Sequence, residues 1–238
     1  MKTLSLSDRM KGYEKVTKSF LIPRMPIIIR LDGKSFHTYT KQFKTKDTFY
    51  SEALANTMKC VLNYLCNKVQ GCVCGYTQSD EINLLLIDYQ NLNTNVWFEG
   101  NIQKISSVTA SMASTYFNYL MSYTVNKNNE QPSLAFCDCR CFNLTKEEVS
   151  NYFLWRQQDA IRNSKQALAY CYYSPKQVYK KNTTELVEML KADFNVDWKE
   201  CSEEFKSGLF YFRNSNKFLT LDVNKGRKLI DSLVFIND

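Results

Sequence analysis

Two adjacent carboxylates interrupt the most apolar part of the chain, and they constrain its fold more than any other feature. Asp80 and Glu81 stand between a short apolar run, Cys72–Tyr76, and a longer one, Ile82–Ile87. Apolar runs of roughly four to eight residues are typical of buried β-strands. A charged pair between two such runs therefore predicts a strand–turn–strand junction with the acids at the turn.

A second carboxylate also stands at the end of a predicted strand. Ile27–Leu31 has the composition of a central strand, and Asp32 and Gly33 follow it directly. Two strand-end aspartates supply hard oxygen ligands on rigid elements, and the glycine leaves room for a phosphate, which is what a Mg²⁺ and nucleotide site needs. Ordinary turn acids explain the same spacing, so the residues alone leave both interpretations open.

The segment between these acids predicts a helix. Apolar residues recur at helical spacing from Leu54 to Val69, and Gly71 ends the pattern. Strand, helix and hairpin in this order form the first half of a ferredoxin-like palm, an α+β fold with an antiparallel sheet and helices on one face. By analogy with polymerase and nucleotide-cyclase palms, Asp32 and Asp80 would then share one edge of adjacent strands.

The rest of the chain predicts a second, smaller region. Residues 102–120 predict a long helix, and Thr145–Glu148 has the capping-box pattern that opens another. We therefore divide the chain into a palm catalytic domain with an N-terminal arm, residues 1–145, and a C-terminal region of helices and a hairpin, residues 146–238. The second region is expected to pack on the palm rather than to fold independently.

Charge and hydropathy narrow the class of partner and the location. The formal net charge of +7 favours a polyanionic partner, although a solvated basic surface explains it equally well. No apolar stretch approaches the roughly 20 residues of a membrane span, and Met1–Tyr13 lacks the apolar core of a secretory signal. Nine cysteines without such a signal indicate reduced thiols, so we expect a cytoplasmic protein.

Cysteines alternate along two predicted strands. Cys72 and Cys74 form one set, the three cysteines of Cys137–Cys141 form the other, and each set is expected on one face of the sheet. A structural zinc is one interpretation, but Cys-x-Cys is not the usual knuckle spacing, and His37 is the only histidine. Small buried core residues are the favoured interpretation.

Four blocks of the sequence form a specific set. They are Arg30-Leu31-Asp32-Gly33-Lys34-Ser35-Phe36-His37, Gly75-Tyr76-Thr77-Gln78-Ser79-Asp80-Glu81, the helix Gln103–Tyr119, and Trp155-Arg156-Gln157-Gln158-Asp159. In this order and spacing the set resembles the tRNA-His guanylyltransferase superfamily, and within it the bacterial and viral type of guanylyltransferase-like proteins.

The resemblance implies a nucleotidyltransferase that adds nucleotides to the 5′ end of tRNA in the 3′-to-5′ direction. Such enzymes activate a 5′-monophosphate with ATP, or use a 5′-triphosphate directly. The 3′-hydroxyl of GTP or another nucleoside triphosphate then attacks, and the activating group leaves. The implied partners are tRNA and these nucleotides, and the implied assembly is a homotetramer.

The resemblance also implies roles for single residues. Asp32, Asp80 and Glu81 would be catalytic, with Glu81 as the supporting acid. Asp32 and Asp80 would bind two Mg²⁺ ions, with the Gly33 carbonyl as a further ligand. The arginine expected three residues before Lys104 is Asn101 here. The residues expected to bind nucleotide are Asp32, Gly33, Lys34, Ser35, Phe36, His37, Lys44, Asp47, Ser79, Asp80 and Lys104.

Polar residues are dense along the helix that contains the tryptophan block. They predict RNA contacts or a solvated face, and the candidate RNA contacts are Arg156, Arg162, Asn163 and Lys165. Eukaryotic members carry His-Ile-Asn-Asn-Leu-Tyr-Asn-Thr where this chain has 160–167. The lost histidine and tyrosine favour template-dependent repair of truncated tRNA over addition of a single G to tRNA-His.

Two other classes of function are weighed against this one. A non-catalytic RNA-binding module on a palm scaffold is an alternative, but intact acids at Asp32 and Asp80 argue against it. A nucleotide cyclase shares the palm, yet this sequence has no Gly-Gly-Asp-Glu-Phe type of loop.

Overall fold

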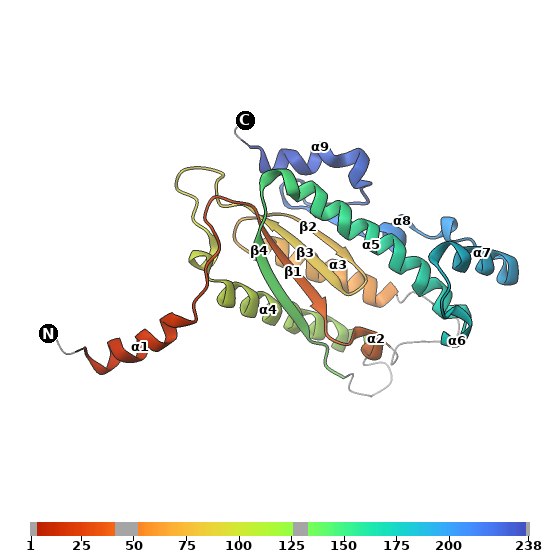
Figure 1. Ribbon diagram of the computed structural model, residues 1–238, viewed down its shortest axis with the longest axis horizontal. Helices are drawn as coiled ribbons and strands as arrows, with labels where there is room; N and C mark the ends of the chain where they lie inside the picture. Colours follow the sequence, from red (N-terminus) through yellow and green to blue (C-terminus); the bar gives the residue numbers. More distant parts are fainter. Residues whose placement is uncertain (1–3, 41–51, 126–132, 237–238) are drawn as a thin grey trace.

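A six-stranded antiparallel sheet forms the centre of the molecule (Figure 1). The computed structural model describes residues 4–40, 52–125 and 133–236. The strands lie in the order β4-β1-β3-β2-β5-β6, and they are β1 (Ile27–Gly33), β2 (Cys72–Gln78), β3 (Glu81–Leu86), β4 (Cys137–Asn143), β5 (Leu209–Phe212) and β6 (Lys217–Leu219). This architecture confirms the predicted α+β palm.

The two palm helices cover one face of the sheet. These helices are α3 (Glu52–Lys68) and α4 (Ile102–Val125), and the odd-numbered residues of β1, such as Ile27 and Ile29, are buried in one cluster with them. Residues alternate between the two faces of a strand, so one β1 side chain in two reaches these helices. The position of α3 and α4 on one face agrees with the predicted palm.

Helices from the C-terminal region cover the opposite face. They are α5 (Lys146–Tyr172) and α9 (Val223–Val234), and their buried residues share a second cluster with Ile28 of β1. The expected hairpin is β5–β6, and β5 pairs with β2 in the central sheet. Because residues 146–238 supply two strands and one helical layer of the same sheet, we propose that they are not an independent domain.

The far end of α5 supports a small helical cluster beyond the sheet (Figure 1). It contains α6 (Pro175–Val178), α7 (Thr183–Phe194), α8 (Glu203–Ser207) and the 3₁₀ turn Trp198–Glu200. Two further 3₁₀ turns, Trp97–Gly100 and Arg213–Ser215, lie outside it. Asn182 and Glu185 form a capping box at α7, whereas Thr145 begins α5 without the side-chain cap bond that its sequence predicts.

The N-terminal arm projects from the body of the molecule (Figure 1). Its helix α1 (Leu6–Val16) contains no buried residue. The chain then reaches the body, where the Leu21 amide donates to the Gly100 carbonyl. A short helix, α2 (Phe36–Tyr39), follows β1. None of the helices in the described ranges is long and apolar enough to cross a membrane.

The two cysteines of β2 do not share a face, which corrects the alternation expected from the sequence. A register shift between Cys72 and Cys74 places Cys72 in the cluster with α3 and Cys74 in the cluster with α5. A bulge inserts an extra residue and so reverses the side-chain alternation beyond it. Within the described ranges, no group of three or more His, Cys, Asp or Glu side chains is arranged to hold a metal.

Candidate active site

The β2–β3 turn meets the end of β1, and this contact brings together residues that are far apart in the sequence. Asp32 of β1 lies opposite Glu81 of β3, and Asp80 stands in the adjoining turn. A Cβ atom on Gly33 would lie only 2.8 Å from Asp80 Oδ2 and 2.3 Å from a ring carbon of Phe36. Only glycine permits this close approach. The structure therefore places Asp32, Gly33 and Asp80 side by side.

Crowding of these carboxylates raises their pKa values. Burial, and next to it the charge of Asp32, raises the pKa of Asp80 to about 6. Burial and the charge of Glu81 likewise raise the pKa of Asp32. The pKa values of both carboxylates stay raised although Arg30 lies 3.5 Å from Asp32, so a cation bound between the two acids would relieve their repulsion.

The raised pKa of Asp80 predicts a pH dependence of stability in metal-free protein. The folded state holds the Asp80 proton more tightly than the unfolded state does, so this residue favours folding most at pH below about 4. As the pH rises through about 6, its contribution should fall by on the order of 1–2 kcal/mol after screening. Denaturant unfolding from pH 4 to 7, with chelator present, measures this change.

Asp80→Asn provides the comparison for that measurement. The asparagine has no proton to lose and stays neutral, so the variant should lose less stability than the wild type over the same pH interval. Equal pH dependence of the free energy of unfolding in the two proteins would contradict the crowded-carboxylate description.

Glu81 lies on the same sheet edge but is bound within the protein. Its side chain is 4% exposed, and its oxygens accept from Arg156 Nε and Nη2 at 2.7 Å, from Arg30 Nη2 at 2.8 Å and from Asn83 Nδ2 at 2.7 Å. These four contacts occupy both carboxylate oxygens. We therefore propose that Glu81, expected among the catalytic residues, has a positioning role in which it fixes β3 and β1 against α5.

The placement of Arg156 corrects its predicted contact with RNA. Its side chain is 3% exposed, and besides Glu81 it binds Asp159 at 2.9 Å. The indole of Trp155, which is half exposed, covers the guanidinium at 4.4 Å from the ring centroid. A buried arginine with all of these partners is not available to a phosphate. Arg156 of the tryptophan block therefore ties α5 to the central sheet through Glu81.

The residues after Gly33 offer fewer backbone donors than the sequence suggests. The Lys34 amide donates to the Phe136 carbonyl at 2.8 Å, so it is not free for a phosphate. Phe36 is buried against Phe117 and is a core side chain. The side chains of Lys34 and His37 are exposed, and Ser35 adopts a left-handed conformation before α2. The amide groups at the start of α2 are the ones that lack intrahelical acceptors.

Three other residues were predicted to contact nucleotide, and the structure describes one of them, Lys104. Lys44 and Asp47 fall outside the described residues. Lys104 is in the first turn of α4, and its ammonium lies 4.6 Å from the Phe98 ring centroid. Further along α4, the Ser114 hydroxyl accepts a hydrogen bond of 2.9 Å from the amide of Cys137, and Cys137 of β4 lies opposite Gly33. Ten residues of helix, about 15 Å, separate Lys104 from Ser114.

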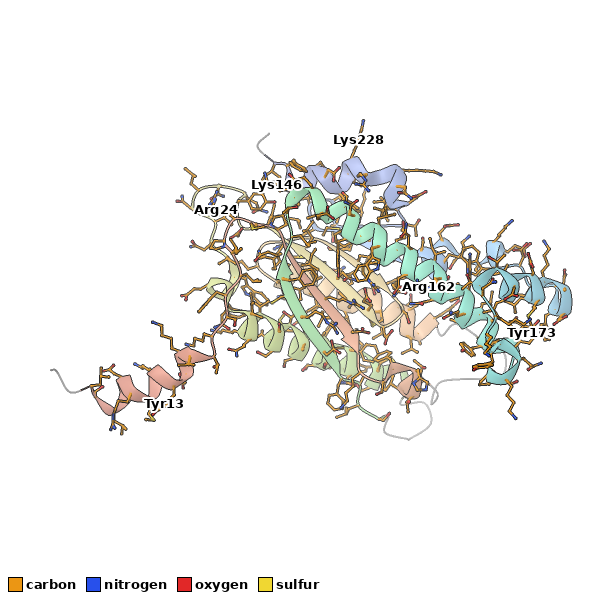
Figure 2. The ribbon with its side chains drawn as sticks, viewed as in Figure 1. Tyr13, Arg24, Lys146, Arg162, Tyr173 and Lys228 are labelled. Atoms are coloured by element: carbon orange, nitrogen blue, oxygen red, sulfur yellow. The ribbon has the colours of Figure 1, made fainter. Side chains whose placement is uncertain are left out.

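The other candidate RNA contacts differ in exposure. Arg162 is 62% exposed on α5 and is paired with Asp159, and Figure 2 shows it where the helix extends past the sheet. Asn163 is exposed, and Lys165 lies 4.7 Å from the Trp198 ring centroid. Arg162 and Asn163 are thus accessible to a partner, and Arg156 is not.

The structure adds two charged neighbours that the sequence did not place. On β4, Asp138 lies opposite Asp32 and Arg140 lies opposite Arg30. Asp138 and Arg140 form an exposed ion pair with each other at 3.1 Å. Their alternation along the strand was visible in the sequence. Only the β1–β4 register shows that they stand beside the aspartates.

The residues of the turn fit a magnesium ion better than a zinc ion. Mg²⁺ usually retains several waters and binds one or two carboxylates together with substrate phosphates. Asp32, Asp80 and the Gly33 carbonyl meet that requirement, since Asp32 is 35% exposed and Asp80 is crowded by it. Glu81 adds no free oxygen.

The antiparallel palm and its aspartate-lined turn define a protein of the nucleotidyltransferase class. The model of the tRNAHis guanylyltransferase family matches residues 7–145. A bacterial tRNA(His) guanylyltransferase-like protein in complex with ATP superposes with a TM-score of 0.90, at 36% identity, over 97% of this chain and 100% of that one. The chain belongs to the tRNAHis guanylyltransferase family, a family of nucleotidyltransferases.

Two further proteins support this assignment. A bacterial tRNA(His) guanylyltransferase-like protein in complex with GTP superposes with a TM-score of 0.79, at 34% identity, over 97% of this chain and 100% of that one. The tRNA(His) guanylyltransferase of Candida glabrata is 26% identical over 90% of this chain and 90% of its own length. The similarity therefore extends beyond the matched palm to the C-terminal region.

Proposed function

We propose that this protein adds nucleotides to the 5′ end of tRNA in the 3′-to-5′ direction and repairs truncated 5′ ends by copying the opposite strand. The observation that carries the proposal is the meeting of Asp32 and Asp80 across Gly33. Its family and its likeness to a protein in complex with ATP support the choice of substrate. We expect it to act in the cytoplasm as a homotetramer.

The reaction has two transfers. In the first, a 5′-phosphate oxygen of the RNA attacks the α-phosphorus of ATP, and pyrophosphate leaves. In the second, the 3′-hydroxyl of an incoming nucleoside triphosphate attacks the activated 5′ phosphorus, and AMP leaves as the new phosphodiester forms. A 5′-triphosphate can replace the activated end, with pyrophosphate as the leaving group.

The chain's own residues position these groups. Two bound Mg²⁺ ions would stabilise the charge of the attacking and leaving oxygens. Asp32, Asp80 and the Gly33 carbonyl would hold them, and the exposed Lys34 and His37 stand on the loop that would face the triphosphate. Positioning and charge stabilisation dominate phosphoryl-type transfer, so no side-chain nucleophile is needed.

The choice of templated repair over addition of one G rests on α5. Residues 160–167 carry no histidine or tyrosine, and Arg162 and Asn163 form its exposed polar part. An RNA held there by phosphate contacts would be held without regard to base. The opposing strand of the RNA then remains the source of sequence information.

A 5′-extension assay tests this choice. Two monophosphorylated tRNAs that lack their first nucleotide, and that differ only in the base opposite the gap, are each incubated with ATP and all four nucleoside triphosphates. The nucleotide added should follow the opposing base. Addition of G to both substrates would instead favour the single-G guanylyltransferase.

A further inference from the structure

A groove on the outward face of α4 is lined by uncharged side chains. Its volume is about 460 Å³, and its walls are Tyr64 of α3 and α4 residues between Ser107 and Tyr119. None of the described residues that line it is charged, although 23% of the whole chain is. Tyr64 and Tyr116 stack with centroids 4.3 Å apart, and Tyr119, which is 54% exposed, stacks beside them.

This composition fits a protein partner rather than RNA. Single-stranded RNA needs cations along its backbone as well as aromatic faces. The sequence of α4 contains one charged residue, Lys104, and its ammonium lies over Phe98 outside the groove. The tyrosines also stack on one another rather than leaving both faces open. Tyrosine enrichment and charge depletion are typical of protein–protein interface cores.

The arm helix α1 has an apolar row that the rest of the described chain leaves exposed. Leu6, Met10 and Tyr13 recur at i, i+4 and i+7, so they share one helix face, and they are 65%, 48% and 75% exposed. Figure 2 shows Tyr13 directed into solvent, away from the body of the molecule. An isolated helix of eleven residues is marginal in water, so α1 needs a surface to pack on.

The dimensions of the arm and the groove match. Eleven residues of α1 span about 16 Å, and the groove from Ser107 to Tyr119 spans about 18 Å along α4. The arm does not lie in the groove of its own chain. The Thr17 and Ser19 carbonyls bind Gln103 and Ile102 at the start of α4, and α1 points away from that helix (Figure 1).

We propose that the groove receives α1 of a second copy of this chain, with the two copies exchanging arms about a two-fold axis near the N-terminal ends of their α4 helices. In that arrangement Met10 of one copy faces Ser111 of the other. An isologous contact brings equivalent surfaces together, so an uncharged surface avoids like-charge repulsion in a chain of net charge +7. The inference rests on the proposed multi-copy assembly and not on the chemistry at the aspartates.

Sedimentation velocity of the full chain tests the surface. The wild type should sediment as more than one copy, and Met10→Asp or Ser111→Asp should weaken the association at least about tenfold by placing a charge in an apolar contact. Gly12→Asp is the matched control, since it adds the same charge on another side of α1 where a Cβ meets nothing within 4 Å. Met10→Lys combined with Ser111→Asp should restore association.

Three results would overturn the inference. These are a wild type that sediments as one copy, a Met10→Asp variant that associates like the wild type, and weaker RNA binding in that variant at unchanged mass. Because α1 buries no residue, its variants should keep the wild-type circular dichroism. Nucleotide addition is measured on the same samples, and a chain that exchanges arms without adding nucleotides contradicts the proposed function alone.

Discussion

Asp32→Asn and Asp80→Asn should each reduce nucleotide addition at least about a thousandfold while the fold stays intact. The two carboxylates meet at the β2–β3 turn, where burial and mutual charge raise the pKa of Asp80 to about 6. If they hold the metal, removing one charge forfeits several kcal/mol of transition-state stabilisation, and about 1.4 kcal/mol corresponds to a factor of ten. Single-turnover extension of an activated RNA measures the loss.

Two controls separate chemistry from folding in that experiment. Asp138 lies opposite Asp32, but its side chain is 60% exposed and already paired with Arg140. Asp138→Asn should therefore lower nucleotide addition by less than about tenfold. Magnesium should raise the melting temperature of the wild type but not of Asp80→Asn, because a ligand stabilises only the state that binds it. Near-normal turnover by either aspartate variant would contradict the metal assignment.

Arg156→Ala should lower the free energy of unfolding by about 3–5 kcal/mol, because it leaves the Glu81 carboxylate buried without its main partner. Arg156 and Glu81 are 3% and 4% exposed and share two hydrogen bonds of 2.7 Å. Glu81→Gln should also destabilise the protein, since Arg156 and Arg30 then lose the buried carboxylate that they share. Denaturant unfolding of both variants measures these losses.

Arg162→Ala is the matched control, because it removes an arginine from the same helix at a site that is 62% exposed. An exposed ion pair contributes about 0–1 kcal/mol, so this variant should unfold like the wild type. RNA affinity should fall more in Arg162→Ala than in Arg156→Ala, which is the reverse of their effects on stability. A stable Arg156→Ala protein that binds RNA poorly would restore Arg156 to the RNA contacts and contradict its positioning role.

The sequence predicted the palm because its signals are local. Apolar runs predicted β1, β2 and β3, apolar residues at helical spacing predicted α3, and Gly33 indicated a close approach at the end of β1. The roles of Glu81 and Arg156 were not accessible in this way, since their pairing joins residues 75 positions apart and depends on how α5 crosses the sheet. An acid beside Asp80 suggests chemistry until its partners are known.

Register and bulges were the other limit. Asp138 stands beside Asp32 only because β4 pairs with β1, a non-local contact that alternation along one strand does not specify. The bulge in β2 likewise moved Cys72 and Cys74 to opposite faces, which a strict two-residue period does not allow for. Both features depend on how strands pair and not on the type of secondary structure.

The most direct test of the central claim is to determine which end of the RNA grows. The substrate is a monophosphorylated tRNA that lacks its first 5′ nucleotide and has a cytosine opposite the gap. It is incubated with the wild-type protein, Mg²⁺, ATP and α-labelled GTP. Digestion of the product should place the labelled nucleotide at the 5′ end, joined by a 3′–5′ phosphodiester, and omitting Mg²⁺ or ATP should prevent its formation. Label at the 3′ end, or an unextended RNA with an active positive control enzyme, would contradict nucleotidyl transfer at the Asp32–Asp80 turn.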